Sequence, residues 1–119
     1  MAGDARIATG SVHHPPDEPY PRLLVMRRWP RGVPKGAVDQ WEPELGPSNA
    51  LLTAYRSGEL DWEAFAGRYR AEVLARPGLL DWAVRMAEGT GVTLLCGSHP
   101  EEECHRSLLA EILRGRLRA

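Results

Sequence analysis

The chain carries a short group of residues whose types are able to do chemistry. Cys96, His99, Cys104 and His105 fall within ten residues, and Arg106 follows directly. A cysteine thiolate can act as a nucleophile, and an imidazole can move a proton for it. The same side chains can ligate zinc, although their spacing matches neither a paired Cys-x-x-Cys motif nor a His-x(3–5)-His motif. We therefore expect Cys96 or His99 to carry any catalysis, and the sequence assigns no metal ligand.

The two cysteines also have an interpretation as core residues. Cys104 shares one row of an expected helix with Leu108 and Ile112, which is typical of a buried structural thiol. Because adjacent residues on a helix diverge by about 100°, Cys104 and His105 are expected to point apart. Cys96 closes a buried strand and fits either role. Nucleophile and core residue both remain open for these thiols.

An anion site is the other chemistry that this segment suggests. Gly97 lets backbone approach a ligand, and Ser98 comes shortly before the N–H groups that begin the expected last helix. Nearby arginines add positive charge. The run Glu101–Glu103 opposes this interpretation, because it places negative charge where an anion would dock.

Three apolar segments predict the strands that position these residues. Gly91–Cys96 and Arg22–Met26 are continuous in apolar character, as buried parallel strands are, and Arg6–Val12 is a weaker candidate. Ligands collect at the carboxyl ends of parallel strands. The ligand-binding residues expected at that edge are Ser11, Arg27, Trp29, Arg31, Gly97, Ser98, Cys104, His105 and Arg106.

Periodicity and capping residues predict four helices. They are Asn49–Ser57 behind a Ser48 cap, Trp62 to about Ala75 behind Asp61, a helix from Pro77 to just before Gly89, and Glu101 to about Leu117. The order of elements predicts an α/β fold with a short, mainly parallel sheet of about three strands, flanked by about four helices on both faces. The first connection, of about nine residues, is short for a parallel crossover, so an antiparallel first strand remains open.

Size and charge limit the classes of function. With 119 residues the chain is expected to form a single α/β domain over residues 1–119, with residues 1–5 as a loose tail. A net charge of -1 does not favour a protein that grips many phosphates of nucleic acid. The segment Arg22–Lys35 nevertheless holds five basic residues and no acidic one, with Trp29 among them. Its alternative role is ion pairing of Arg27 and Arg28 with acidic residues of the helical middle.

Location and partners follow from what the sequence lacks. No apolar run reaches the roughly 18 residues of a membrane span, and the start of the chain shows no signal-peptide pattern. Two cysteines suit a reducing compartment, so we expect a cytoplasmic protein. The sequence identifies no cofactor and no oligomeric state.

Several sequence blocks resemble the domain of unknown function 488 family, in its short YeaO-like branch. The similar blocks are Leu23–Val33, Val38–Trp41, Leu45–Ser48, Trp62–Tyr69 and Val92–Leu95. The pattern Cys96-x(7)-Cys104-His-Arg106 and the segment Ile7–Ser11 are more similar to the longer branch of that family. The longer members imply a parallel first strand. The resemblance implies fold and site location, and it implies no reaction.

Two positions depart from the family pattern. The short branch has an Asp where this chain has Met26, and the longer branch has a Glu where it has Ser98. Both carboxylates would lie at the expected edge of the sheet, so a base or ligand that relatives carry there is missing or replaced here.

These observations favour a cytosolic protein that binds a small anionic or nucleotide-like ligand at the strand ends. Arg27, Arg31 and Arg106 would hold the charge of that ligand. One alternative is a non-catalytic module that touches nucleic acid or a protein partner through Arg22–Lys35. A second alternative is a thiol- or metal-dependent hydrolase or transferase.

Overall fold

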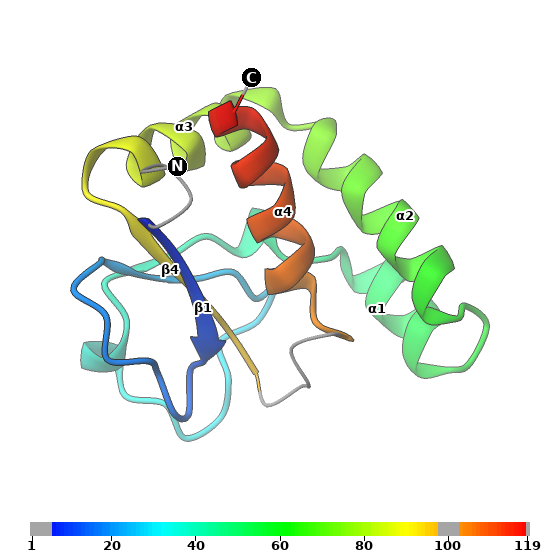
Figure 1. Cartoon of the computed structure of the whole chain (residues 1–119). Coiled ribbons are helices and arrows are strands. Elements are labelled where there is room, and N and C mark those ends of the chain that lie inside the picture. Colours follow the sequence, from blue (N-terminus) through cyan, green and yellow to red (C-terminus); the bar gives the residue numbers. More distant parts are fainter. Residues whose placement is uncertain (1–5, 98–102, 119) are drawn as a thin grey trace.

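The computed structural model describes residues 6–97 and 103–118, which form a small α/β domain (Figure 1). Along the chain its elements are β1 (Ile7–Ser11), β2 (Arg22–Leu24), β3 (Gln40–Trp41), α1 (Asn49–Arg56), α2 (Trp62–Leu74), α3 (Pro77–Gly89), β4 (Val92–Cys96) and α4 (His105–Arg118). The α/β prediction is confirmed, with four strands in place of about three. The additional strand, β3, is a two-residue exposed edge, too short for any periodic signal.

The four strands form one parallel sheet in the order β1-β4-β2-β3. The central strand β4 is buried at all five residues, as its apolar sequence predicts. Its pairing sets Ser11 opposite Cys96 and Leu24 opposite Leu95, so β1, β2 and β4 end at the same edge. The orientation of β1 that the sequence left open is therefore parallel.

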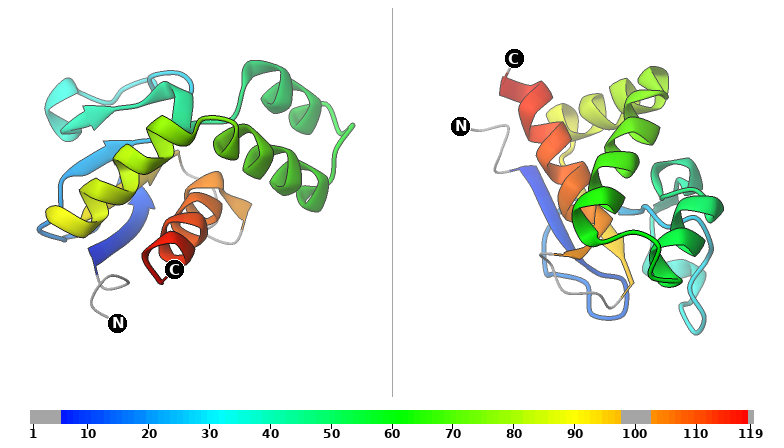
Figure 2. Two further views of the ribbon diagram at one scale, coloured as in Figure 1. Left: turned by 90° about the horizontal axis from the view of Figure 1, so that it is seen from above. Right: turned by 90° about the vertical axis from the view of Figure 1, so that its right-hand side faces the viewer.

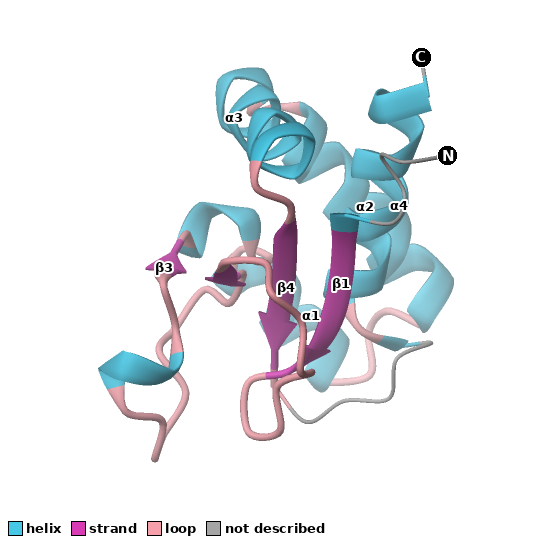
Figure 3. Ribbon diagram, turned by 60° about the vertical axis from the view of Figure 1, so that its left-hand side comes forward, coloured by secondary structure: helices cyan, strands magenta, loops and turns pink. Residues whose placement is uncertain are grey.

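The two faces of the sheet are covered differently, and the expectation of helices on both faces is wrong. Val92 and Leu94 face a core to which all four helices contribute. Leu24 and Leu95 face a smaller cluster with Val12, packed beneath loop residues. Figure 3 shows loop segments crossing this second face. The segment between β1 and β2 is too short and too rich in proline to form a helix, so it crosses as a loop.

The helices are arranged as a layer over the first face of the sheet. Helix α4 contacts both α2 and α3, and α1 pairs with α2 in a hairpin that extends to one side of the sheet (Figure 2). The predicted caps are confirmed. The Ser48 hydroxyl accepts from the Leu51 N–H at 3.1 Å, and the Asp61 carboxylate accepts from the Ala64 N–H at 2.8 Å. No helix within the described ranges is long and apolar enough to cross a membrane.

Helix α4 begins at His105, four residues later than predicted. Cys104 precedes it in a tight turn, where the Ser107 N–H donates to the Cys104 carbonyl at 3.1 Å. The first-turn position expected for Glu103 is therefore wrong, and Glu101 and Glu102 lie outside the described residues. The late start also removes the helical geometry that was expected to separate Cys104 from His105.

Candidate functional site

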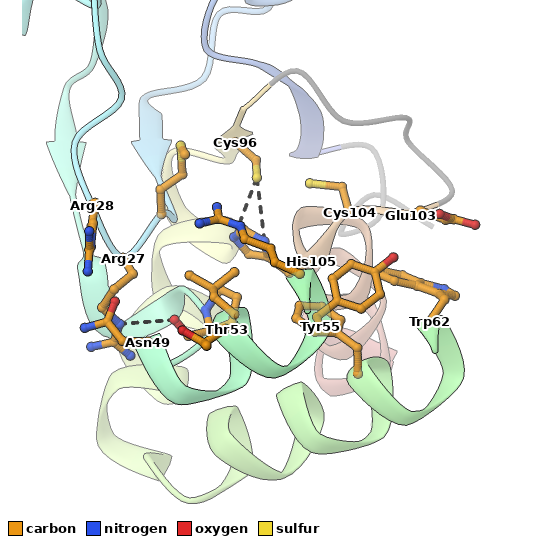
Figure 4. Close-up of a pocket in the computed structure, with 15 residues that line it drawn as sticks. Arg27, Arg28, Asn49, Thr53, Tyr55, Trp62, Cys96, Glu103, Cys104 and His105 are labelled. Carbon is orange, nitrogen blue, oxygen red and sulfur yellow. Dashed lines mark hydrogen bonds between the residues drawn. The ribbon is translucent and has the colours of Figure 1, made fainter. Parts of the chain in front are cut away.

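A pocket of about 340 Å³ lies where β2 and β4 end against α1, α2 and the start of α4 (Figure 4). It is at the sheet edge where the sequence predicted a site. Of the residues expected there, Cys96, Arg27, Cys104 and His105 line the pocket. Its surface includes a floor of sulfur and imidazole groups, a basic wall and an aromatic wall, and the carboxylate of Glu103 and the polar side chains of Asn49 and Thr53 also line it.

The floor consists of Cys96, Cys104 and His105, all buried. One sulfur or ring nitrogen from each residue lies within 4.8 Å of the other two. The Cys96 sulfur is 3.6 Å from Nδ1 of His105 and 3.7 Å from Nε2 (Figure 4). The end of β4 supplies the first group, and the turn into α4 supplies the other two. The expectation that Cys104 and His105 point apart is therefore wrong.

The ring of His105 is held in one orientation from two sides. Its Nε2 bonds to the backbone carbonyl of Val25, just after β2, and its ring packs against that of Tyr69 in an edge-type arrangement at a centroid distance of 5.4 Å. Because a carbonyl oxygen can only accept, Nε2 carries the hydrogen in this bond. The lone pair of the neutral ring is then on Nδ1, which lies 3.6 Å from the Cys96 sulfur.

Arg106 is a buried cation behind the floor, with 4% of its surface exposed. Its Nη1 donates to the Gly97 carbonyl at 3.1 Å and to the Cys104 sulfur at 3.5 Å. The guanidinium therefore braces the end of β4 against the start of α4. Arg106 does not line the pocket, although the sequence predicted that it would hold the charge of a ligand there.

The environment of Cys96 favours the protonated thiol. A side-chain hydrogen bond with Cys104, burial, and repulsion from a Cys104 thiolate all raise the pKa of Cys96 well above its usual range. The Gly97 N–H and the charge of Arg106 act in the opposite direction and are outweighed. A free thiolate nucleophile needs a lowered pKa, so this environment does not by itself activate Cys96.

Three side chains of the helical hairpin form the aromatic wall. Tyr55 lies 6.1 Å from Trp62 and 4.6 Å from Phe65, measured between ring centroids. Burial, followed by the nearby charge of Glu103, raises the pKa of Tyr55. The sequence assigned Trp62 to the core, yet it is half-buried and also lines the pocket. Tyr55 lies in the last turn of α1, and Trp62 begins α2. The short link between the two predicted helices is the sequence signal that could have placed these two side chains together.

The basic wall carries three guanidinium groups, of Arg27, Arg28 and Arg56. Arg27 pairs with Glu44 at 3.0 Å and donates to the carbonyls of Gly46 and Pro47 at 3.2 Å each. Arg27 thus forms an ion pair, but its partner Glu44 lies in the turn before α1 and not in the helical middle where the sequence predicted one. Within the described ranges, Arg28 and Arg56 form no hydrogen bond or ion pair. Sequence reasoning did not select either of these two for the site.

Five of the expected ligand residues lie outside the pocket lining: Arg106, described above, and Gly97, Ser11, Trp29 and Arg31. Gly97 is buried, and its carbonyl accepts from Arg106. Ser11 ends β1, and its hydroxyl accepts from the His13 N–H at 3.1 Å. Trp29 packs on the loop-covered face, where its Nε1 donates to the Val33 carbonyl at 2.8 Å. Arg31 is exposed. Ser98 and His99, the other candidates, lie outside the described residues.

Comparison with known proteins gives a family and one curated relative. Residues 7–117 match a family model described as DUF488-N3a, Active DUF488-N3 subclade. The chain is 33% identical over 95 residues to the Uncharacterized protein YeaO of Escherichia coli (strain K12), covering 78% of this chain and 83% of that protein. No solved structure matches.

Proposed function

The chain belongs to the DUF488 family, and we propose that it binds a small anionic or nucleotide-like ligand in the pocket at the strand ends. The observation that carries this proposal is the basic wall. Arg28 and Arg56 line the pocket, and neither forms an ion pair or a hydrogen bond within the part of the chain that the structure describes. Guanidinium groups without a protein partner are suited to a phosphate or carboxylate, which they can bind in a bidentate manner.

The shape and composition of the pocket support a ligand of small-molecule size. A volume of about 340 Å³ falls at the lower end of the range of roughly 300–1,000 Å³ for small-molecule sites. The rings of Tyr55 and Trp62 lie across the pocket from Arg28 in Figure 4. An aromatic surface opposite a basic one suits a ligand that has both a planar ring and a charged group. The matched family model carries the description Active DUF488-N3 subclade, which supports a function for this domain.

The proposal changes which residues would hold the ligand. Arg28 and Arg56 take the role first given to Arg31 and Arg106, because they line the pocket. Arg27 keeps a place in the wall, with its charge partly neutralised by Glu44. The cytoplasmic location expected from the sequence stays part of the proposal, since a reducing compartment would keep the thiols of the floor free.

Calorimetric titration of the full chain with inorganic phosphate, pyrophosphate and AMP tests the proposal. We expect saturable binding of at least one probe, weakened roughly tenfold or more in Arg28→Gln and in Arg56→Gln. A hydrogen bond to a charged group contributes about 1.5–3 kcal/mol, which is the reason for this magnitude. Arg85→Gln is the matched control, because Arg85 is an exposed arginine of α3 outside the pocket.

Two results would contradict the proposal. One is the absence of binding by all three probes. The other is binding that Arg85→Gln weakens as much as Arg28→Gln or Arg56→Gln does, since this would indicate attraction to the overall charge of the protein.

A further inference from the structure

The floor of the pocket has the composition of a metal site. Two thiols and one imidazole converge from the end of β4 and the start of α4, and all three are buried. Thiolate and imidazole are the ligands that Zn²⁺ prefers in proteins, and two cysteines with one histidine is a known set for three protein ligands. We propose that Cys96, Cys104 and His105 bind a zinc ion. This inference goes beyond the proposed ligand binding and does not depend on it.

The ligand atoms lie close enough together for one tetrahedral ion to bind all three. With Zn–S of about 2.3 Å and Zn–N of about 2.0–2.1 Å, a tetrahedral site separates sulfur from nitrogen by about 3.6 Å and two sulfurs by about 3.8 Å. The Cys96 sulfur lies 3.6 Å from Nδ1 of His105. The ligand atoms of the whole set fall within 4.8 Å of one another. A tetrahedral site needs the Cys96 side chain to rotate, so that its sulfur lies farther from Nε2 of His105 than the present 3.7 Å.

The groups around the three residues support ligation. A zinc-bound histidine usually donates its other ring N–H to a carbonyl or a carboxylate, which fixes the tautomer. Here Nε2 of His105 bonds to the Val25 carbonyl, so its hydrogen is on Nε2 and Nδ1 is the nitrogen able to ligate a metal. Arg106 donates to the Cys104 sulfur at 3.5 Å, an interaction that also suits a metal-bound thiolate.

The charges balance on binding. Zn²⁺ replaces the protons of two thiols, so two Zn–S bonds form, two protons pass to solvent, and the neutral imidazole adds a Zn–N bond. The zinc and two thiolates together carry no net charge, which lowers the cost of burying them beside the cation of Arg106. All three ligands line the pocket, so the remaining tetrahedral position would face it.

Metal analysis of the full chain tests the site directly. After purification under a thiol-free reductant and without chelator, we expect about one zinc per chain to survive dialysis. Cobalt added to the metal-free chain should give the intense visible bands of a tetrahedral ion and a sulfur-to-cobalt charge-transfer band. Cys96→Ser, Cys104→Ser and His105→Ala should each lower zinc retention and change these bands. The cobalt spectrum of the unchanged chain needs no variant, so the test stands even if a variant does not fold.

His13→Ala/His14→Ala is the matched control, because this pair of exposed histidines lies outside the cluster and should leave zinc and the cobalt spectrum unchanged. Three results would overturn the site. They are a reduced chain that takes up neither metal, full zinc retention in a folded Cys96→Ser/Cys104→Ser variant, and a Cys96–Cys104 disulfide that persists under reductant. None of these measurements uses an anionic ligand, so the site can fail while the proposed ligand binding holds.

Discussion

The sulfur of Cys96 lies 3.6 Å from Nδ1 of His105, although a strand end and a helix start supply the two groups. The contact joins β4 to α4, and the Val25 carbonyl ties the same imidazole to the end of β2. One histidine therefore connects three elements at the edge of the sheet where the pocket opens. Changes to this ring, or to the groups that hold it, should affect stability and binding together.

Bound zinc should stabilise the fold, because the proposed ligands join β4 to α4. A ligand at one hundred times its dissociation constant stabilises the folded state by about 2.7 kcal/mol. Zinc at that excess should therefore raise Tm by several degrees over the chelator-treated chain, as scanning calorimetry under reductant would measure. The Cys96→Ser/Cys104→Ser variant should show no such shift. An equal shift in that variant would indicate that zinc acts elsewhere.

The proposed metal should have one coordination position open to the pocket. Azide added to the cobalt-substituted chain should change the visible bands, because it can occupy a position that no protein group fills. Absorption spectroscopy across an azide titration measures this. A spectrum that saturating azide leaves unchanged would mean that four protein groups surround the ion.

The buried phenol of Tyr69 should make the protein sensitive to alkaline pH. Burial, followed by the charges of Cys96, Cys104 and Glu72, raises the pKa of Tyr69 well above 10.0. The folded state then keeps a proton that the unfolded state loses near pH 10. The resulting stabilisation is complete below that pH and falls by about 1.4 kcal/mol per unit as pH rises toward the folded-state pKa. Urea unfolding at pH 8, 10 and 11 would measure the slope.

Tyr69→Phe is the test of that assignment. It removes the hydrogen bond from the phenol to the Leu45 carbonyl, 2.7 Å long, and should destabilise the protein by about 1–3 kcal/mol at pH 8. The loss of stability above pH 10 should then be shallower than in the unchanged chain. If the stability of both proteins falls equally with pH, a group other than Tyr69 causes the loss of stability at alkaline pH.

Gly46 should be intolerant of any side chain, because it allows the turn before α1 to approach β2 closely. A Cβ there would lie 2.5 Å from the Arg27 nitrogen and 2.9 Å from the Met26 carbonyl carbon. Both are backbone atoms, so Gly46→Ala should destabilise the protein by about 1–3 kcal/mol through overpacking. It should also displace the basic wall of the pocket and weaken binding of the anionic probes.

Gly67→Ala is the matched control for this substitution. Gly67 is exposed within α2, and a Cβ there meets nothing within 4 Å. Alanine should stabilise the helix by about 0.5–1 kcal/mol. Thermal unfolding of both variants measures the difference. Equal changes in the stability of the two variants would mean that the backbone contact at Gly46 does not exclude a side chain there.

The sequence by itself determined the helices α1 and α2 and the strand β4. Ser48 and Asp61 cap their helices through bonds that span three residues, and the apolar run of β4 specifies burial on both faces. These features depend on local hydrogen bonding and on the side-chain periods of helix and strand. The sheet edge also follows from the sequence, because parallel strands bring their carboxyl ends together.

Only the tertiary structure decided which side chains meet at that edge. The start of α4 at His105 depends on a turn at Cys104, where an equally plausible helical pattern predicted an earlier start. Arg28 lies in the loop after β2 and Arg56 ends α1, so no local period relates them. Strand order and the packing of loops against one face set these juxtapositions, since they depend on contacts between segments far apart in the chain. The residue types of the site were therefore visible in the sequence, and their geometry was not.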